Sequence, residues 1–435
     1  MSERAPRPKL LKMALCLLLL TPGTARAQAQ EPPAKPPRLK REHFGRSLER
    51  LKWDAEQKRA VEAARARAKK GGGGGEEDEV VRVETSLVVC DVLVLDPQGR
   101  AVKGLVREDF LINEDGRPQE VGVFALGDSA NVPRSIVLIL DYSGSMRPFI
   151  VNSVLAAKIL VDQLNPRDRM ALVTDDVELL VNFTGDKALL RKRLDGLERK
   201  ATAEEFKLSN YSRSLQFSAL MATLRELFDE EDTRPIVIFQ TDGDELPLLR
   251  DPPMPVFDIP GLPAKTLRDM HARIEANRPP FSLEDVFRTA ERSRATVYTV
   301  IPGVRLIGLE PGEEPVKAEA MRRAYVASEP VPGNAYTDAF RTPYLEYVLR
   351  YWPQQQTALD DLSKLTGGWT KFLEKPSQAA GIYADIFADI GNRYVVGFYP
   401  ANKARDGKRR RVQIEVRGHP EYTVWGRKSY YAPLD

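Results

Sequence analysis

The sequence predicts an α/β fold with a doubly wound, mostly parallel sheet, together with a small N-terminal all-β module and a C-terminal β-hairpin. Short apolar runs such as SIVLILD (135–141) and PIVIFQTD (235–242) have the composition of strands that are buried on both faces. Helix-like stretches alternate with such runs through the centre of the chain. Regular β-α alternation implies parallel strands with helices on both faces of the sheet.

The first 27 residues have the order of a secretory signal peptide. The basic stretch MSERAPRPKLLK precedes the apolar run MALCLLLL, and Ala25 and Ala27 then stand in an A-x-A arrangement. The apolar run is too short to span a bilayer, so we expect cleavage near Gln28 and no transmembrane segment in the mature chain. An uncleaved anchor is the alternative, whereas Leu15 before Cys16 argues against lipid attachment.

Composition gives no argument for nucleic-acid binding, for a disulfide or for zinc. The formal net charge is +3, and residues 1–27 hold five basic residues against one acidic residue, so the remaining chain is close to neutral. After signal cleavage Cys90 is the only cysteine, and its apolar surroundings predict a buried, inert thiol. The histidines, His43, His271 and His419, lack the spacing of zinc ligands.

Residues 28–79 predict a disordered or charged helical linker. The segment is Pro-rich at 28–37, highly charged at 38–70 and Gly-rich at 71–79. Four apolar residues recur at helical spacing within it: Phe44, Leu48, Leu51 and Ala55. A solvated, marginal helix and a helix that contacts an acidic surface or an anionic membrane are both open.

Both ends of the folded region predict antiparallel strands. Residues 80–130 begin with the strand-like VVRVETSLVVCDVLVLD and contain turn signals at 96–99 and 114–116, which indicates a small β module. The segments YVVGFYP and RRVQIEV predict a hairpin within residues 394–435. The basic run Lys408–Arg411 fits a solvated strand edge better than a nucleic-acid patch.

The α/β domain is expected at residues 131–393. Its strands are predicted at 135–141, 169–174, 177–183, 235–242 and 295–301. Its helices are predicted at 147–164, 186–200, 214–229, 282–293, 356–366 and 377–392. Two long segments, 245–281 and 302–355, then count as insertions after strands.

Both insertions follow the carboxyl ends of parallel strands, the edge at which open α/β sheets bind ligands. Long loops on a rigid scaffold often carry binding function, so we expect both to crowd the rim of a site there. The first is rich in proline, and the second is rich in aromatic residues: Tyr325, Tyr336, Phe340, Tyr344, Tyr347, Tyr351 and Trp352. Core packing of an inserted helix and contact with a partner both remain open for these aromatics.

Polar side chains follow two of the buried strands. Strand 135–141 runs into DYSGSM, which supplies Asp141, Ser143 and Ser145, and strand 235–242 ends in TDGD, which supplies Asp242. Two carboxylates and two hydroxyls at one sheet edge form an all-oxygen set. Such a set suits a hard divalent cation such as Mg²⁺.

The D-x-S-x-S pattern after a buried strand resembles the metal-ion-dependent adhesion site of the von Willebrand factor type A (VWA) and integrin I domains, whose fold is Rossmann-like. That site also uses a hydroxyl from a later loop and an aspartate after a later strand, and Asp242 matches the aspartate. The stretch YSRSLQFSAL places Ser214 on the position of the family's threonine, with Ser212 as a second candidate. The glycines usual at this loop are missing.

Four segments extend the resemblance to the acidobacterial VWFA-related family, from about residue 80 to about residue 420: VREDFLINEDGRPQEVGVF, IVLILDYSGSM, LSKLTGGWTKF and NRYVVGFYPANKARDGKRRRVQIEV. The resemblance implies that Mg²⁺, or Mn²⁺ or Ca²⁺, contacts Ser143, Ser145 and Ser214 directly. Asp141 and Asp242 would bind it directly or through water. Neutral first ligands leave the metal a net positive charge and an open position, which a carboxylate of a protein partner can fill.

The expected function is therefore that of an exported, metal-dependent binding or adhesion-type protein, secreted or held in the periplasm or bacterial envelope. Enzyme chemistry finds little support. An enzyme of the haloacid dehalogenase type needs a second aspartate at position 143, where Ser143 stands, and no P-loop or nearby histidine base is present. The alternative function is a metal-free structural or assembly scaffold of the cell envelope.

Overall fold

The computed structural model describes residues 44–49, 51, 87–126, 133–146, 148–202, 214–228, 233–249, 265, 268, 272, 278–328 and 341–433. All of them belong to one compact unit, Leu39–Asp435. The predicted signal peptide with its cleavage site, the Gly-rich linker, Ser212 and most of insertion 245–281 lie outside the described residues.

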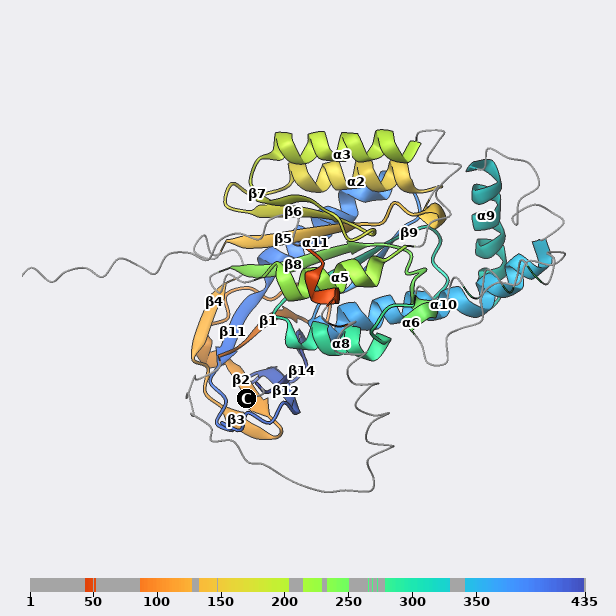
Figure 1. Cartoon of the computed structure of the whole chain (residues 1–435). Helices are drawn as coiled ribbons and strands as arrows, with labels where there is room; N and C mark the ends of the chain where they lie inside the picture. The colour runs from red at the N-terminus through yellow and green to blue at the C-terminus, as the bar shows by residue number, and fades with distance from the viewer. Residues whose placement is uncertain are drawn as a thin grey trace, which may run out of the picture. The chain divides into compact units, whose positions relative to one another are not determined.

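A six-stranded sheet forms the centre of the chain, in the order β10-β9-β8-β5-β6-β7 (Figure 1). Its strands are β5 (Arg134–Leu140), β6 (Arg169–Thr174), β7 (Leu179–Thr184), β8 (Arg234–Gln240), β9 (Thr296–Pro302) and β10 (Thr370–Leu373). Neighbouring strands are parallel except β6 and β7. Chain order runs outward from β5 in both directions, so the sheet is doubly wound, as the sequence predicts. The switch point lies between β5 and β8.

Helices cover both faces of this sheet, which explains the continuous apolar runs of its strands. One face packs against α2 (Ile150–Asp162), α3 (Lys187–Thr202) and α11 (Ala379–Asn392). The other packs against α5 (Gln216–Glu226), α8 (Leu283–Arg292) and α10 (Arg341–Thr366). Successive residues of β5 alternate between these two cores: Ile136, Leu138 and Leu140 face the first, and Val137 and Ile139 face the second.

Four elements differ from the sequence-based expectation. The helix α10 begins at Arg341 and passes through Pro353, whereas the sequence predicts a helix only from residue 356, because proline normally marks a helix boundary. The short helix α6 (Leu246–Leu249) lies within the first insertion, and the 16-residue helix α9 (Glu313–Ser328) lies within the second. The strand β10 is a short edge strand with no clear signal in the sequence.

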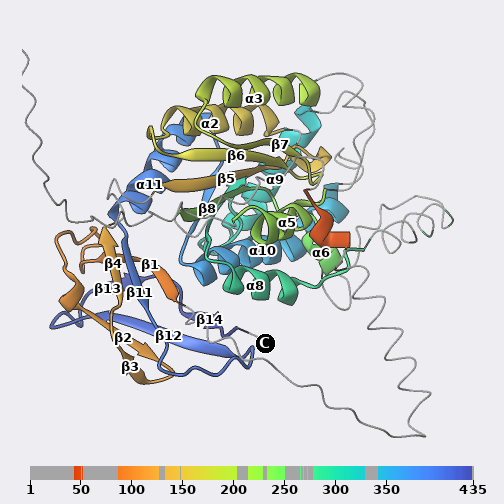
Figure 2. The same ribbon diagram turned by 60° about the vertical axis from the view of Figure 1, so that its left-hand side comes forward.

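Two four-stranded antiparallel sheets, ordered β13-β1-β11-β4 and β14-β12-β2-β3, combine strands from both ends of the chain (Figure 2). The N-terminal strands are β1 (Val88–Leu95), β2 (Phe110–Glu114), β3 (Arg117–Gln119) and β4 (Val123–Leu126). The C-terminal strands are β11 (Tyr394–Phe398), β12 (Arg409–Val416), β13 (Thr423–Trp425) and β14 (Ser429–Tyr431). Both sheets contribute to one apolar cluster, which includes Val92, Phe110, Val396 and Val412. We call this pair of sheets the β-sandwich.

The pairing of β11 and β12 differs from the predicted C-terminal hairpin. The strand β11 pairs with β1 and β4, and β12 pairs with β2 and β14. A period-two pattern shows which face of a strand is buried but does not identify its partner strand. The connection 399–408 is also longer than the roughly two to five residues of most hairpin loops.

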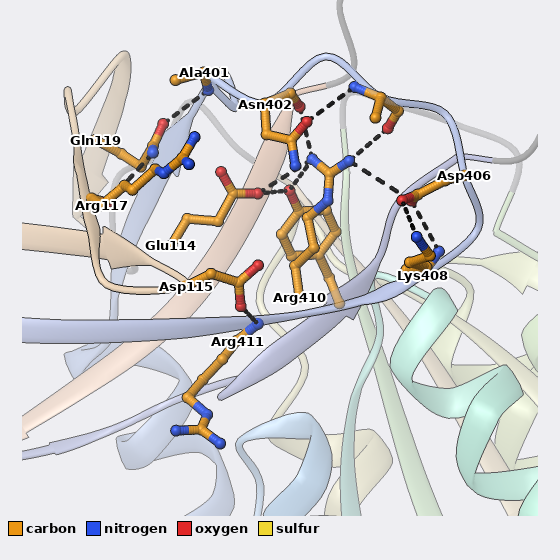
Figure 3. A network of polar contacts seen from close by, with 12 residues as sticks. Glu114, Asp115, Arg117, Gln119, Ala401, Asn402, Asp406, Lys408, Arg410 and Arg411 are labelled. Carbon is orange, nitrogen blue, oxygen red and sulfur yellow. Dashed lines mark hydrogen bonds and ion pairs between the residues drawn. The ribbon is translucent and has the colours of Figure 1, made fainter.

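A polar network holds this connection in place (Figure 3). The Arg410 guanidinium lies 3.3 Å from the Glu114 carboxylate and donates to the carbonyl of Asn402 at 2.6 Å. The Tyr430 hydroxyl also donates to Glu114. Arg410 is therefore buried and paired, and although its neighbours in the basic run are exposed, the run is not the predicted edge, because β12 lies between β14 and β2.

Cys90 and the described residues of the N-terminal apolar stripe are both at least partly shielded from solvent. Cys90 is buried, and burial raises the pKa of its thiol to about 11, which fits the expected inert thiol. The described members of the predicted apolar stripe, Phe44, Leu48 and Leu51, pack against the core on the α5 side of the sheet instead of facing solvent. A separate observation concerns membrane spans: none of the described helices is both long enough and apolar enough to cross a bilayer.

Candidate metal centre

The carboxyl ends of β5, β6 and β8 lie side by side. Leu140, the last residue of β5, is level with Thr174 of β6 and with Gln240 of β8. The next residues along the three strands are Asp141, Asp175 and the pair Thr241–Asp242. The switch point of the sheet therefore carries an aspartate after each of three neighbouring strands, and all three are buried.

A fourth aspartate joins them through a tight turn. Oxygens of Asp141, Asp242 and Asp244 all lie within 4.8 Å of one another. Gly243 between the last two has a φ of +80°, and a Cβ there would come within 3.0 Å of Leu359. Only glycine accepts both conditions readily, so the turn that returns Asp244 to the site depends on it. We call Asp141, Asp175, Asp242 and Asp244 the acidic cluster.

The D-x-S-x-S loop folds over its own first residue. The amide of Ser143 donates to Asp141 Oδ1 at 3.0 Å, and the hydroxyls of Ser143 and Ser145 lie 3.0 Å apart. The amide of Tyr142 donates to Asp175 at 3.1 Å, which ties the loop to the end of β6. The short 3₁₀ turn Gly144–Met146 follows, and α2 begins at Ile150.

Ser214, the predicted loop ligand, is buried beside the cluster. Its hydroxyl donates to Asp175 Oδ2 at 3.1 Å, and the amide of Leu215 donates to the carbonyl of Asp175 at 3.0 Å. The alternative candidate, Ser212, lies outside the described residues. All five predicted site residues are thus gathered at one sheet edge, with Ser214 connected through Asp175.

Gln216, the first residue of α5, reaches three of the four aspartates. Its Nε2 lies 2.8 Å from Asp141, 3.3 Å from Asp242 and 2.5 Å from Asp244. Its Oε1 accepts from the amide of Glu245 at 3.0 Å. The carboxylate of Glu245 in turn accepts from amides at the start of α5, where the helix dipole favours an anion. Glu245 therefore acts as a helix cap, whereas the amide of Gln216 donates into the acidic cluster.

Burial raises the pKa of every carboxyl in the acidic cluster, and neighbouring carboxylates add to the shift at Asp175, Asp242 and Asp244. The pKa of Asp244 rises to about 7. Hydrogen bonds from Ser145 lower the pKa of Asp242 and Asp244 and so oppose the shift. Among the described residues, no lysine or arginine forms an ion pair with any of the four. Buried carboxylates without a counter-charge are costly, so they take up protons or bind a cation.

The donor set fits a hard divalent cation. The Oδ2 of Asp242 is buried and has no hydrogen-bond partner. The remaining donors are carboxylates and the hydroxyls of Ser143, Ser145 and Ser214, so every candidate ligand atom is an oxygen. Oxygen-only sets are what Mg²⁺, Mn²⁺ and Ca²⁺ prefer.

The described part of insertion 302–355 borders the site. The Tyr325 hydroxyl of α9 donates to the carbonyl of Ser145 at 2.5 Å. Burial raises the pKa of Tyr347 in α10 to about 12, and the charges of Asp244 and Asp242 contribute to the shift, which places Tyr347 near them. Tyr325, Tyr344 and Trp352 also pack together in a small apolar core. The aromatics therefore serve core packing and rim formation together, while Tyr336 and Phe340 lie outside the described residues.

Three contributors to the site are absent from the sequence-based prediction. Asp175 follows a predicted strand in the sequence TDD, and Asp244 belongs to the same TDGD motif as Asp242. Both follow buried strands as Asp141 and Asp242 do, so the same sequence pattern indicates them. Gln216 carries no comparable signal, because a single amide at the start of a helix belongs to no recognisable pattern.

Residues 136–245 match the family model of the von Willebrand factor type A domain. This segment contains all five predicted site residues together with Asp175, Gln216 and Asp244. No match is found among curated protein sequences. The narrower resemblance to the acidobacterial family stays a prediction.

Several solved structures are similar to the chain. A von Willebrand factor type A protein from Catenulispora acidiphila is 13% identical, with 75% of this chain and 74% of that chain covered and a TM-score of 0.32. The vWF domain of the type V pilus tip protein Mfa5 from Porphyromonas gingivalis is 12% identical, with 60% and 96% covered and a TM-score of 0.31. Manganese-loaded TRAP protein from Plasmodium vivax is 11% identical, with 74% and 98% covered and a TM-score of 0.27.

Proposed function

We propose that this protein, which contains a von Willebrand factor type A domain, binds a divalent cation of the Mg²⁺ type at the acidic cluster and presents it to a carboxylate of a protein partner. One observation carries the proposal: two buried aspartates, Asp141 and Asp242, and the half-buried Asp244 bring oxygens within 4.8 Å of one another, and no described lysine or arginine pairs with them. VWA domains are generally binding or adhesion modules rather than enzymes, and they often bind proteins.

In this proposal the hydroxyls of Ser143, Ser145 and Ser214 are neutral ligands, and Asp141 and Asp242 bind the cation directly or through water. The unpartnered Oδ2 of Asp242 supports its assignment as a ligand. A bound cation would neutralise charge that the fold leaves uncompensated and would keep a position for an external carboxylate. Asp175 acts on the site through the Tyr142 amide and the Ser214 hydroxyl, which it holds at 3.1 Å.

We also propose that the protein is exported and works outside the cytoplasm, in the envelope or beyond it. The support is the basic, apolar and A-x-A order of residues 1–27. N-terminal sequencing of the native protein tests it: a mature chain that begins near Gln28 agrees with export, whereas one that begins at Met1 or Ser2 contradicts it.

A metal-free scaffold is the second candidate function, and one contact favours it. The Gln216 amide nitrogen lies 2.5–3.3 Å from oxygens of three carboxylates and shares its two N–H donors among them, so it supplies part of the positive potential that a cation would supply. In a scaffold, this amide would be enough to hold the loop ends together, and no cation would bind.

Calorimetry with Mg²⁺ and Mn²⁺ decides between the two functions. The metal-binding proposal expects one site in the wild-type protein, no binding in Asp141→Ala and weaker binding in Ser214→Ala. The matched control is Asp361→Ala, an exposed aspartate in α10, which should bind as the wild type does. Equal affinity in the wild type and Asp141→Ala, or no binding in any of these proteins, would favour the scaffold.

A further inference from the structure

A groove lies beside the D-x-S-x-S loop, with α3 as one of its walls. Its volume is about 380 Å³. Tyr142 of the loop and Thr174 at the end of β6 line one side, and apolar residues of α3 such as Leu189 and Leu197 form part of its lining. Pockets of this size hold a few side chains of a ligand.

Cationic side chains dominate this groove. Lys192, Arg193, Arg199 and Lys200 of α3 line it, against a single carboxylate, that of Glu178. All four cationic residues are exposed. An anion that enters the groove therefore meets several positive charges at once, in surroundings partly shielded from water.

The two faces of α3 and its neighbour α2 differ in how their charges are paired. Away from the groove, Arg191 pairs with Asp162 at 2.5 Å, and Lys158 of α2 pairs with Asp195 of α3 at 2.7 Å. Lys192 and Arg193, which line the groove, form no ion pair within the described residues. Arg191 is thus neutralised by a neighbouring carboxylate, whereas Lys192 and Arg193 remain available to a ligand.

Tyr142 connects the groove to the acidic cluster. It stands between Asp141 and Ser143 in the chain, and its amide donates to Asp175. Its hydroxyl donates to Asp176 at 2.5 Å and accepts from Lys200 at 2.9 Å, and the Lys200 ammonium lies 4.9 Å from the centre of its ring. A peptide that leaves the metal centre along this residue enters the groove within a few residues, at roughly 3.5 Å per residue of extended chain.

We propose that this groove binds an acidic stretch of the same protein partner whose carboxylate reaches the metal. The inference rests on the proposed function, because it takes the metal ligand to be a carboxylate of a protein. The groove then determines specificity: it selects partners that carry further aspartates or glutamates next to the one at the metal. Positive charge at Lys192 and Arg193 supplies the selection, and the apolar lining residues contact the aliphatic parts of the peptide's side chains.

Two labelled synthetic peptides test this by fluorescence polarisation in Mg²⁺. One carries a single glutamate within a glycine-serine sequence, and the other carries four glutamates in the same length. The wild-type protein should bind the four-glutamate peptide about fivefold more tightly, as expected for two or three partly exposed ion pairs. The preference should shrink as salt is raised, because added ions screen such pairs.

Charge reversal then assigns the preference to the groove. The double variant Lys192→Glu/Arg193→Glu should bind both peptides equally while its Mg²⁺-dependent binding of the single-glutamate peptide stays unchanged. The control Lys103→Glu/Arg107→Glu makes the same change in net charge at exposed positions of the β-sandwich region and should keep the preference. An unchanged preference in the groove variant, or an equal loss in the control, would overturn the proposal.

The same titrations in EDTA separate this inference from the proposed function. One outcome is that EDTA leaves wild-type binding unchanged while charge reversal in the groove still weakens binding of the four-glutamate peptide. That result supports the groove as a peptide site and contradicts the metal-dependent function. If binding needs Mg²⁺ and shows no preference for extra glutamates, the function stands and the groove fails. Stronger competition by heparin or single-stranded DNA than by the unlabelled four-glutamate peptide would contradict the assignment to an acidic peptide.

Discussion

Among the residues that the structure describes, buried charges are paired at the amino ends of the strands in the six-stranded sheet and unpaired at the carboxyl ends. We call these two ends of the sheet the amino edge and the carboxyl edge. At the amino edge, Arg134 at the start of β5 pairs with Asp168 at 2.6 Å, and Arg234 at the start of β8 pairs with Asp91 at 3.1 Å. At the carboxyl edge, where the same two strands end, the acidic cluster has no lysine or arginine partner in the described part of the chain. The fold can therefore pair buried charges, and it does so at one edge only.

The difference indicates that the amino edge contributes to the stability of the fold, whereas the carboxyl edge is suited to binding a ligand. The paired edge adjoins the β-sandwich, because Asp91 belongs to β1 and Arg393 directly precedes β11. Its charges are satisfied within the chain, so it has no need of a ligand. The unpaired edge is stable only with protons, with the Gln216 amide or with a cation, which makes its state depend on the solution.

The largest effect is expected at the amino edge. Arg393 is fully buried and pairs with Asp389 at 2.8 Å. The substitution Arg393→Leu should lower the free energy of unfolding by about 3–5 kcal/mol, because it leaves Asp389 buried without its counter-charge. Urea unfolding in EDTA measures this loss, and Mg²⁺ should not restore it. A loss below about 1 kcal/mol would show that the amino edge does not depend on its ion pairs as the contrast requires.

A smaller effect of opposite sign is expected at the carboxyl edge. Saturating Mg²⁺ should raise the free energy of unfolding by about 2.7 kcal/mol at a hundredfold excess over the dissociation constant, because the ion binds only the folded state. Thermal unfolding with and without Mg²⁺ measures it. The variant Asp242→Ala should lose this stabilisation and yet remain folded in EDTA. A wild-type melting temperature that does not respond to Mg²⁺ or Mn²⁺ would remove the distinction between the edges.

The third effect is a pH dependence of the metal-free protein. Burial and the nearby Asp141 carboxylate raise the pKa of Asp244 from its ordinary value of 3.8 to about 7 in the folded state. Because the folded state holds this proton more tightly than the unfolded chain does, the contribution to stability is complete below about pH 4 and is lost as the pH rises through about 7. Urea unfolding in EDTA between pH 5 and pH 8 should show this decline.

The variant Asp244→Asn should flatten the decline in metal-free protein, since an amide does not titrate. In Mg²⁺, the stability of the wild type should instead increase with pH, because the cation competes with protons and binds more tightly as the pH rises. Metal-free stability that stays constant or increases from pH 5 to pH 8 would contradict the prediction.

Local patterns were sufficient to predict much of the carboxyl edge. Each buried strand is a short apolar run, and the polar residues that end it follow directly in the sequence, so Asp141 and Asp242 could be brought together by topology alone. The same reasoning extends to Asp175. The turn at Gly243 that returns Asp244 to the cluster is a local feature as well.

Strand pairing and helix packing depend on residues far apart in the sequence and could not be predicted in the same way. The alternation in β11 and β12 shows which side chains are buried, but one partner strand of each, β1 for β11 and β2 for β12, lies about 300 residues away. Gln216 reaches the acidic cluster because α5 begins beside the end of β8, which depends on how the helix packs. The long helix α10 includes Pro353, so its start depends on packing that overrides the local signal.

The most direct test of the account is a crystal structure of the protein grown with Mn²⁺, with anomalous scattering used to locate the ion. The account predicts one strong anomalous peak at the carboxyl edge, about 2.0–2.3 Å from the hydroxyl oxygens of Ser143 and Ser145, with Asp141 and Asp242 bound directly or through water. Crystals of Asp141→Ala grown in the same way should lack the peak. A wild-type map with no anomalous peak there, and with the Gln216 amide still bonded to the aspartates, would contradict the claim that the acidic cluster is a metal site.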